Sequence, residues 1–260
     1  MRGDAALALL ALLAACSTGI SPFRGRARIG RDAYAVFVGD APGNRTDLFG
    51  VRADGGEVVQ ITFSNVAETA PALSPDGSVV AFIRQHSLGD SARADVWVMN
   101  LLSGAERELP LGADAARPER VGWWDDGRVI YVRAGAELWR LDAPPAPPAA
   151  RPVAPAKRAA ADSSLAVWLG APPFARVVAC GDSLCAQGDS GRAAAFAAGH
   201  DPVRWGPDSV GYVVDGRLVI RPDGPGHGRP MEWTGAPAHP RQFTFFPGLR
   251  STDAGPQAPP

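Results

Sequence analysis

The sequence predicts an all-β fold, a β-propeller with about five four-stranded blades (six possible), closed by a C-terminal strand that joins the first blade. A short phrase returns in register at residues 71–77, 121–127 and 203–209, each time followed by runs rich in β-branched and aromatic residues. Four short strands in each unit, repeating roughly every 33 to 50 residues, are typical of propeller blades. A last alternating run covers residues 241–246 and has no partner strands after it.

The expected second strands are runs of Val, Ile, Phe and Tyr, the residue types enriched in strands. They span residues 34–38, 78–84, 128–133, 176–180 and 209–214. Third strands are expected at residues 47–51, 95–99, 137–141, 183–187 and 217–221. Weaker fourth strands are expected at residues 58–62, 106–109, 150–153, 192–197 and 229–233.

The first blade needs an innermost strand from elsewhere, because residues 17–31 are poor in β formers. Stacked blades cover one another's apolar faces and leave only short edges, so the ring has to close. We expect residues 241–246 to pair beside the strand that begins at Tyr34. The propeller domain is then residues 32–247, followed by a disordered tail at 248–260.

The N-terminal segment has the pattern of an export signal. Arg2 precedes an apolar run at residues 5–15, which is shorter than the ~20 residues that span a bilayer but fits the core of a secretory signal. Residues 13–16, Leu-Ala-Ala-Cys, resemble the lipobox of bacterial lipoproteins. The resemblance implies a signal peptide over residues 1–15, lipid attachment at Cys16 and a lipid-anchored tether over 16–31. With Ser17 after the cysteine, it implies an outer-membrane protein facing the periplasm; an ordinary secreted signal is the alternative.

Residues 71–100 carry the best-defined repeat. Pro-x-x-Ser-Pro-Asp-Gly is followed by a Val-x-Phe strand and by Asp-Val-Trp-Val-Met-Asn, a succession that resembles the propeller repeat of the TolB family of the periplasmic Tol-Pal system. The resemblance covers about 200 residues unevenly and is strongest in the second blade. TolB has six blades and a separate N-terminal domain, whereas this sequence shows about five blades and a lipobox. The resemblance implies the fold and a cell-envelope setting, and no particular partner.

Composition and cysteine usage fit an exported protein. The formal net charge of −1 gives no indication of nucleic-acid binding, and we expect no cofactor. The four histidines show no metal-binding spacing, so no metal site is expected. Cys180 and Cys185 take the places of a cross-strand aromatic pair in the other blades, which favours a local disulfide; two reduced, buried thiols are the alternative.

Two apparent serine-nucleophile motifs lie beside this cysteine pair. Residues 181–184 spell Gly-Asp-Ser-Leu, which resembles the opening motif of the lipase family named after those letters. Residues 188–191 spell Gly-Asp-Ser-Gly, which resembles the nucleophile loop of serine proteases. The sequence lacks the histidine motif that each of these two families requires. Gly-Asp-Ser is also typical of β-turns. We therefore expect no catalytic residue and no enzymatic activity. The alternative is a glycosidase-like hydrolase with channel carboxylates drawn from Asp32, Glu68, Glu119 and Asp201.

Binding residues are expected in the longer connections, which lie on one face of the propeller. The candidates are Asn65, Glu68, His86, Asp90, Arg93, Asp114, Arg117 and Glu119. An ordinary solvated loop is the alternative for each of them. The function expected from the sequence is a lipid-anchored, non-enzymatic binding or scaffold module for an envelope protein, peptide or glycan.

Overall fold

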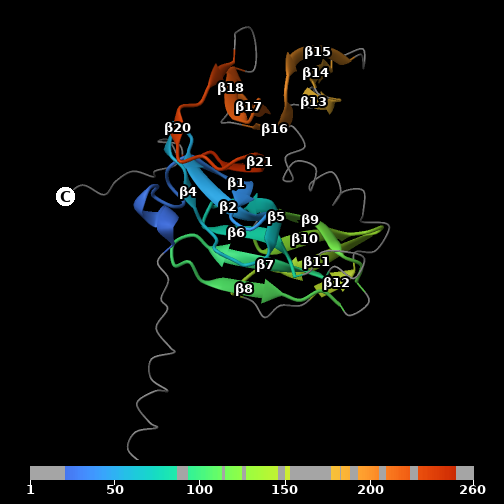
Figure 1. Ribbon diagram of the computed structural model, residues 1–260. Helices are drawn as coiled ribbons and strands as arrows, with labels where there is room; N and C mark the ends of the chain where they lie inside the picture. Colours follow the sequence, from blue (N-terminus) through green and yellow to red (C-terminus); the bar gives the residue numbers. More distant parts are fainter. Residues whose placement is uncertain are drawn as a thin grey trace, which may run out of the picture.

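The described residues of the chain are mainly β-strands that form five antiparallel sheets (Figure 1). The computed structural model describes residues 21–86, 93–112, 115–124, 127–145, 150–152, 177–181, 183–187, 193–204, 209–222 and 228–249. The sheets follow one another along the chain and are named blades 1 to 5. The all-β propeller fold expected from the sequence is confirmed.

Blades 1 and 2 contain four strands each. Blade 1 has the order β21 (Arg241–Phe246), β1 (Tyr34–Ala41), β2 (Arg45–Arg52) and β4 (Val59–Gln60). Blade 2 has the order β5 (Ala67–Leu73), β6 (Val79–Gln85), β7 (Ala94–Asn100) and β8 (Glu106–Leu109). Neighbouring strands are antiparallel, so short turns connect most of them.

Blades 3 to 5 continue the pattern. Blade 3 contains β9 (Pro118–Trp123), β10 (Val129–Ala134), β11 (Glu137–Asp142) and β12 (Ala150–Pro152). Blade 4 contains β13 (Val177–Cys180), β14 (Ser183–Gln187) and β15 (Ala193–Ala198) as its described strands. Blade 5 contains β16 (His200–Arg204), β17 (Ser209–Val214), β18 (Arg217–Pro222) and β19 (Arg229–Pro230).

The C-terminal strand completes blade 1. β21 pairs with β1 in antiparallel register, Tyr34 opposite Phe246 and Ala35 opposite Phe245. The two ends of the described chain are joined again where the amide of Leu249 donates to the carbonyl of Arg31 at 2.9 Å. The closing strand expected at residues 241–246 is thereby confirmed.

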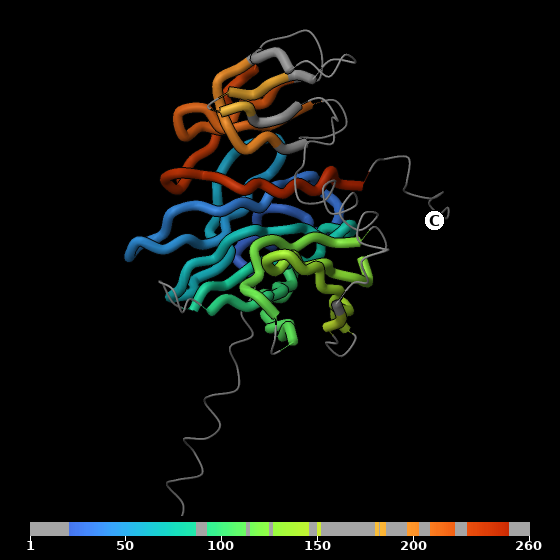
Figure 2. Tube along the Cα trace, turned by 90° about the vertical axis from the view of Figure 1, so that its right-hand side faces the viewer, coloured from blue at the N-terminus to red at the C-terminus, as the bar shows by residue number. Residues whose placement is uncertain are grey.

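Figure 2 shows blades 5, 1, 2 and 3 in succession, and buried apolar side chains pack between them. Separate buried clusters lie between blades 1 and 2, 2 and 3, 4 and 5, and 5 and 1. Among the described residues no such cluster joins blades 3 and 4. Because each cluster draws on two blades, each sheet loses much of its apolar stability without its neighbours.

The turn in the repeated phrase fastens blade 2 to blade 1. Asp76 accepts hydrogen bonds from the hydroxyl of Ser74 at 2.6 Å and from the amide of Ser78 at 3.0 Å, which holds the turn. Gly77 has a φ of 71°, and its carbonyl accepts a hydrogen bond from the buried hydroxyl of Tyr34. Pro-Asp-Gly is therefore both a tight turn and a contact between blades.

The packed part of the chain begins before residue 32, which corrects the expected domain boundary. Pro22–Gly25 forms a 3-10 turn, and Phe23 is completely buried, edge-on to Tyr34 with ring centroids 5.2 Å apart. Phe23 lies so close to Gly50 that a Cβ there would come within 2.8 Å of its ring. Ser21, Phe23 and Ala27 are all buried, so this segment packs against the propeller without forming a strand.

The expected fourth strand of blade 5 divides between two sheets. Arg229–Pro230 stays in blade 5 as β19, whereas β20 (Trp233–Thr234) pairs in parallel with β3 (Gly56–Glu57). Trp233 lies against Phe37 of blade 1, with ring centroids 5.5 Å apart. The chain therefore leaves blade 5 after Pro230, and the indole of Trp233 contributes to the packing against blade 1.

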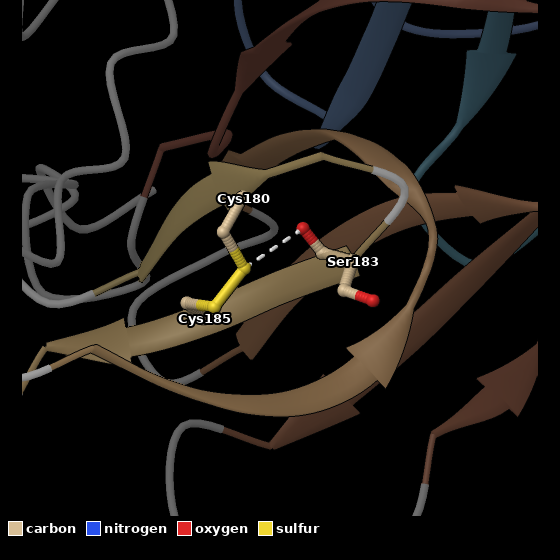
Figure 3. Close-up of a disulfide and its surroundings, with 3 residues drawn as sticks. All are labelled: Cys180, Ser183 and Cys185. Carbon is tan, nitrogen blue, oxygen red and sulfur yellow. Dashed lines mark hydrogen bonds between the residues drawn. A yellow bond between two sulfur atoms is a disulfide. The ribbon is translucent and has the colours of Figure 1, made fainter.

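Blade 4 contains the cysteine pair. Cys180 and Cys185 form a disulfide with a Cα–Cα distance of 5.9 Å (Figure 3). They are diagonal neighbours and not opposed, since Cys180 pairs with Ser183 and Cys185 pairs with Val178. The two strands leave the same two-residue connection as the strands expected at residues 176–180 and 183–187. Sγ of Cys180 lies 3.4 Å from the carbonyl oxygen of Ser183, a packing contact because a disulfide sulfur has no proton to donate.

Candidate functional site

A hollow lies between blades 1 and 2. It has a volume of about 720 Å³, within the usual range of ligand pockets. Blade 1 and the segment after it supply Ile61, Phe63, Ser64, Asn65 and Val66; blade 2 supplies Arg84, His86, Trp97, Met99, Gly104 and Glu106; Ser21 and Pro22 complete the wall. We name this hollow the blade 1–2 pocket.

Arg84 is the charged group of the pocket and is held by two carboxylates. Its guanidinium donates to Oε1 of Glu68 at 2.6 and 2.9 Å and lies 2.8 Å from Oε2 of Glu106. It also covers the ring of Trp97, 4.3 Å from the centroid. A guanidinium fixed on two sides and stacked on an indole is rigid, so it presents a preorganised surface to a ligand.

Glu68 occupies a different place from the one expected. The sequence favoured an exposed loop residue, but Glu68 is completely buried in β5, directly opposite Arg84. Burial raises the pKa of Glu68, while Arg84 opposes the shift. Glu68 therefore acts on the pocket through Arg84 and does not line it.

Two hydrogen-bonding groups of the pocket have no protein partner. The indole nitrogen of Trp97 and the hydroxyl of Ser21 are both buried and unpaired. An indole N–H can only donate, and buried polar groups are nearly always paired in folded proteins. These two atoms are therefore the parts of the pocket best suited to a ligand.

A second polar layer lies behind Arg84. Asp47 is completely buried, accepts a hydrogen bond from Nε2 of Gln60 at 2.7 Å and leaves its other oxygen unpaired. Desolvation raises the pKa of Asp47, partly offset by the nearby Arg45 and Arg84. Blades 1 and 2 thus meet at a buried group of acids and arginines.

The structure brings two expected binding residues into the blade 1–2 pocket and two into a smaller one. Asn65 and His86 line the first, where Nε2 of His86 lies 3.0 Å from Oδ2 of Asp95. Arg93 and Arg117 line a hollow of about 380 Å³ formed by residues from blades 2 and 3. The expected binding residues that line a hollow are therefore divided between two separate hollows.

The remaining expected residues lie elsewhere. Glu119 is exposed in β9 beside a register shift and lines neither hollow. Cys16, Asp90 and Asp114 lie outside the described residues, as do residues 1–15 and most of the expected tail. Within the described ranges, no three His, Cys, Asp or Glu side chains form a potential metal site.

Irregular backbone recurs in the first strands of blades 2 and 5 and in the closing strand of blade 1. Ala70, Asp201 and Gln242 have φ values of 51°, 50° and 52° and lie at register shifts in β5, β16 and β21. Oδ2 of Asp201 accepts from the amide of Gln242 at 3.4 Å, and Oε1 of Gln242 accepts from the amide of Ala70 at 2.7 Å. Asp201, a candidate channel carboxylate, thus caps a backbone group. Asp32, another candidate, is paired with Arg28 at 2.8 Å.

Sequence reasoning missed Ser21, Arg84 and Trp97. Arg84 and Trp97 stand in runs interpreted only as strands, although an arginine between apolar residues is a signal of a buried partner. Ser21 falls in the supposed tether and carries no such signal. What unites the three residues is the contact between two blades and the N-terminal segment, which no local pattern describes.

Comparisons with known proteins identify a fold likeness only. No protein-family model and no curated protein matches the chain. Similar solved structures include TolB from Acinetobacter baumannii (13% identity, TM-score 0.38, 86% of this chain and 69% of that chain). They also include a putative TolB from Agrobacterium tumefaciens (15% identity, TM-score 0.38, 83% of this chain and 74% of that chain). A third is a putative 6-phosphogluconolactonase from Bacteroides uniformis (13% identity, TM-score 0.33, 78% of this chain and 68% of that chain). At these values the likenesses assign neither family nor activity.

None of the described segments is a helix long and apolar enough to cross a membrane.

Proposed function

We propose that this protein is a non-enzymatic binding module of the cell envelope, anchored through lipid on Cys16, and that it binds its ligand in the blade 1–2 pocket. The observation that carries the proposal is the pair of buried, unpaired polar groups, Trp97 Nε1 and Ser21 Oγ, among the residues that line the blade 1–2 pocket. The lipobox-like residues 13–16 support the anchor.

The rim of the pocket has the composition of an interaction site. Phe63 is 67% exposed at its edge, an unusual position for a large apolar side chain that contributes little to the core. Ile61 and Met99, both nearly buried, provide an apolar wall beside the charged Arg84. Apolar walls with a few oriented polar groups are the usual composition of binding sites.

Site-specific photo-crosslinking in cells tests the binding site. A photoreactive phenylalanine analogue replaces Phe63 in the full chain, and in a control it replaces Leu102, which is 42% exposed and does not line the pocket. We expect a discrete cross-linked envelope component from position 63 and none from position 102. No product at position 63, or the same product from both positions, would contradict the proposal.

Metabolic labelling tests the anchor separately. Cells given an alkyne fatty acid should label the wild-type chain and leave the Cys16→Ala variant unlabelled. The labelled chain should sediment with membranes. An unlabelled wild-type chain would remove the anchor from the proposal and leave the pocket untouched.

A further inference from the structure

The blade 1–2 pocket follows the length of two strands. Its lining residues run from His86, just after β6, past Arg84 and Trp97 to Gly104, in the turn after β7. The seven residues of β7 span about 20 Å at the usual rise of a strand. An extended chain of roughly six residues covers the same length.

The unpaired groups determine what the occupant must offer. Trp97 Nε1 can only donate, so the ligand has to present an acceptor there. Ser21 is 2% exposed and its hydroxyl is unpaired, so a second acceptor on the ligand would satisfy this hydroxyl. A peptide backbone provides carbonyl oxygens at regular intervals, together with side chains that alternate toward an apolar wall.

The charges of the pocket favour neutral or cationic occupants. Arg84 lies between Glu68 and Glu106, so the trio carries one negative charge when both acids are ionised. Glu106, with its side chain 29% exposed, is the carboxylate nearest to an incoming ligand. An anionic ligand would face this excess at short range with little screening.

The aromatic surface fits a sugar poorly. Sugar rings usually stack on an open aromatic face, but the guanidinium of Arg84 already covers the ring of Trp97. Ile61, Val66 and Met99 are aliphatic, and Phe63 is the remaining aromatic lining residue that the structure describes. These walls fit aliphatic side chains.

We propose that the blade 1–2 pocket binds an extended peptide segment that is uncharged or cationic, with backbone carbonyls that accept hydrogen bonds from Trp97 Nε1 and Ser21 Oγ. The proposal rests on the proposed function, because it names the ligand class of the same pocket. Aliphatic side chains of the peptide lie against Ile61 and Met99, and a basic side chain reaches Glu106.

Calorimetric titration of the full, detergent-solubilised chain tests the ligand class. The probes are acetyl-Lys-Leu-Ala-Leu-Ala-Lys-amide, the same peptide with Glu in place of both Lys residues, and chitohexaose. We expect the lysine peptide to bind at least tenfold more tightly than the glutamate peptide, and chitohexaose not to bind. Equal affinity for the two peptides, binding of chitohexaose in preference to both, or no binding of the lysine peptide would each overturn the proposal.

Two pairs of variants locate the hydrogen bonds. Trp97→Phe keeps an aromatic ring and removes the donor; its control is Trp139→Phe, whose Nε1 lies in blade 3 and donates to Glu137 at 3.1 Å. The control for Ser21→Ala is Ser103→Ala, at a residue in an exposed turn. We expect each pocket variant to weaken the lysine peptide about tenfold, as for one lost buried hydrogen bond, and each control to leave it unchanged. Unchanged affinity in both pocket variants would overturn the proposal.

Failure here is distinguishable from failure of the proposed function. If position 63 still cross-links an envelope component while the lysine peptide does not bind, the pocket is functional and its ligand belongs to another class. If position 63 yields no cross-link, the proposed function itself is contradicted.

Discussion

The amide of Ala70 donates a hydrogen bond of 2.7 Å to Oε1 of Gln242, which lies 172 residues further along the chain. Both residues have left-handed backbone at register shifts of innermost strands. A bulge leaves an amide without a partner in its own ladder, and here the side chain of one bulge caps the amide of the next. Asp201 caps Gln242 in the same way. These side-chain caps end at Ala70, because the side chain of alanine has no hydrogen-bond acceptor for an amide of blade 3.

Gln242→Ala should weaken the contact between the closing strand β21 and strand β5 of blade 2. We expect a loss of about 1 kcal/mol in the free energy of unfolding, since the amide of Ala70 is left without its partner. Urea unfolding followed by intrinsic fluorescence measures the change. Gln242→Glu keeps an acceptor and serves as the control. Equal midpoints for Gln242→Ala and wild type would show that water replaces the cap at no cost.

Gly77→Ala should be among the most damaging single-methyl changes in the chain. A Cβ at this position would lie 2.7 Å from the ring of Phe246 and close to the hydroxyl of Tyr34, on a backbone with φ of 71°. We expect a loss of about 2 to 4 kcal/mol from crowding and strain together. Thermal unfolding of Gly25→Ala, where nothing lies within 4 Å, is the matched control. A loss below 1 kcal/mol at Gly77 would contradict this account of the joint.

The buried acids predict a distinctive pH dependence. Desolvation raises the folded-state pKa of Asp47 and of Glu68 above the ordinary values of these carboxyl groups. The folded state favours the protonated, neutral form of both acids. Their contribution to the free energy of unfolding is therefore fully present below their unfolded-state pKa values, and it is lost as pH rises through the raised folded-state values. Asp32 and Asp40 have lowered pKa values and act in the opposite direction, losing stability as pH falls below about 4.

Asp47→Asn isolates one of these acids. We expect the variant to gain stability relative to wild type at pH 7, and the gain to shrink as pH falls through the raised pKa of Asp47, where the wild-type acid takes up its proton. Urea unfolding at several pH values measures the difference. Asp54→Asn, at an exposed acid with a lowered pKa, should show the opposite sign. A pH-independent difference for Asp47→Asn would contradict the buried-acid account.

The fold could be predicted because its signals are local. Alternating runs, Pro-Asp-Gly turns and the unpaired run at residues 241–246 indicate strands, turns and a missing partner without any tertiary information. The pocket could not be predicted in this way, because its walls come from segments that are distant in sequence. Glu68 shows the difficulty well. It stands near a bulge at Ala70 that interrupts the period-two pattern of β5, so the start of the strand resembled a loop.

Blade 4 provides the last prediction, because it is the blade with a covalent link. The disulfide joins residues five apart, a short loop for which chain-entropy arguments give about 2 kcal/mol. Replacing Cys180 and Cys185 together by serine should therefore lower the thermal midpoint by several degrees. The loss should be concentrated in blade 4, since the pair spans one hairpin and leaves the joint between β21 and β1 intact. Hydrogen exchange measured by mass spectrometry should show faster exchange in residues 177–187 and unchanged protection in β1. Faster exchange spread equally over all five blades would mean that the hairpin bond stabilises the whole ring.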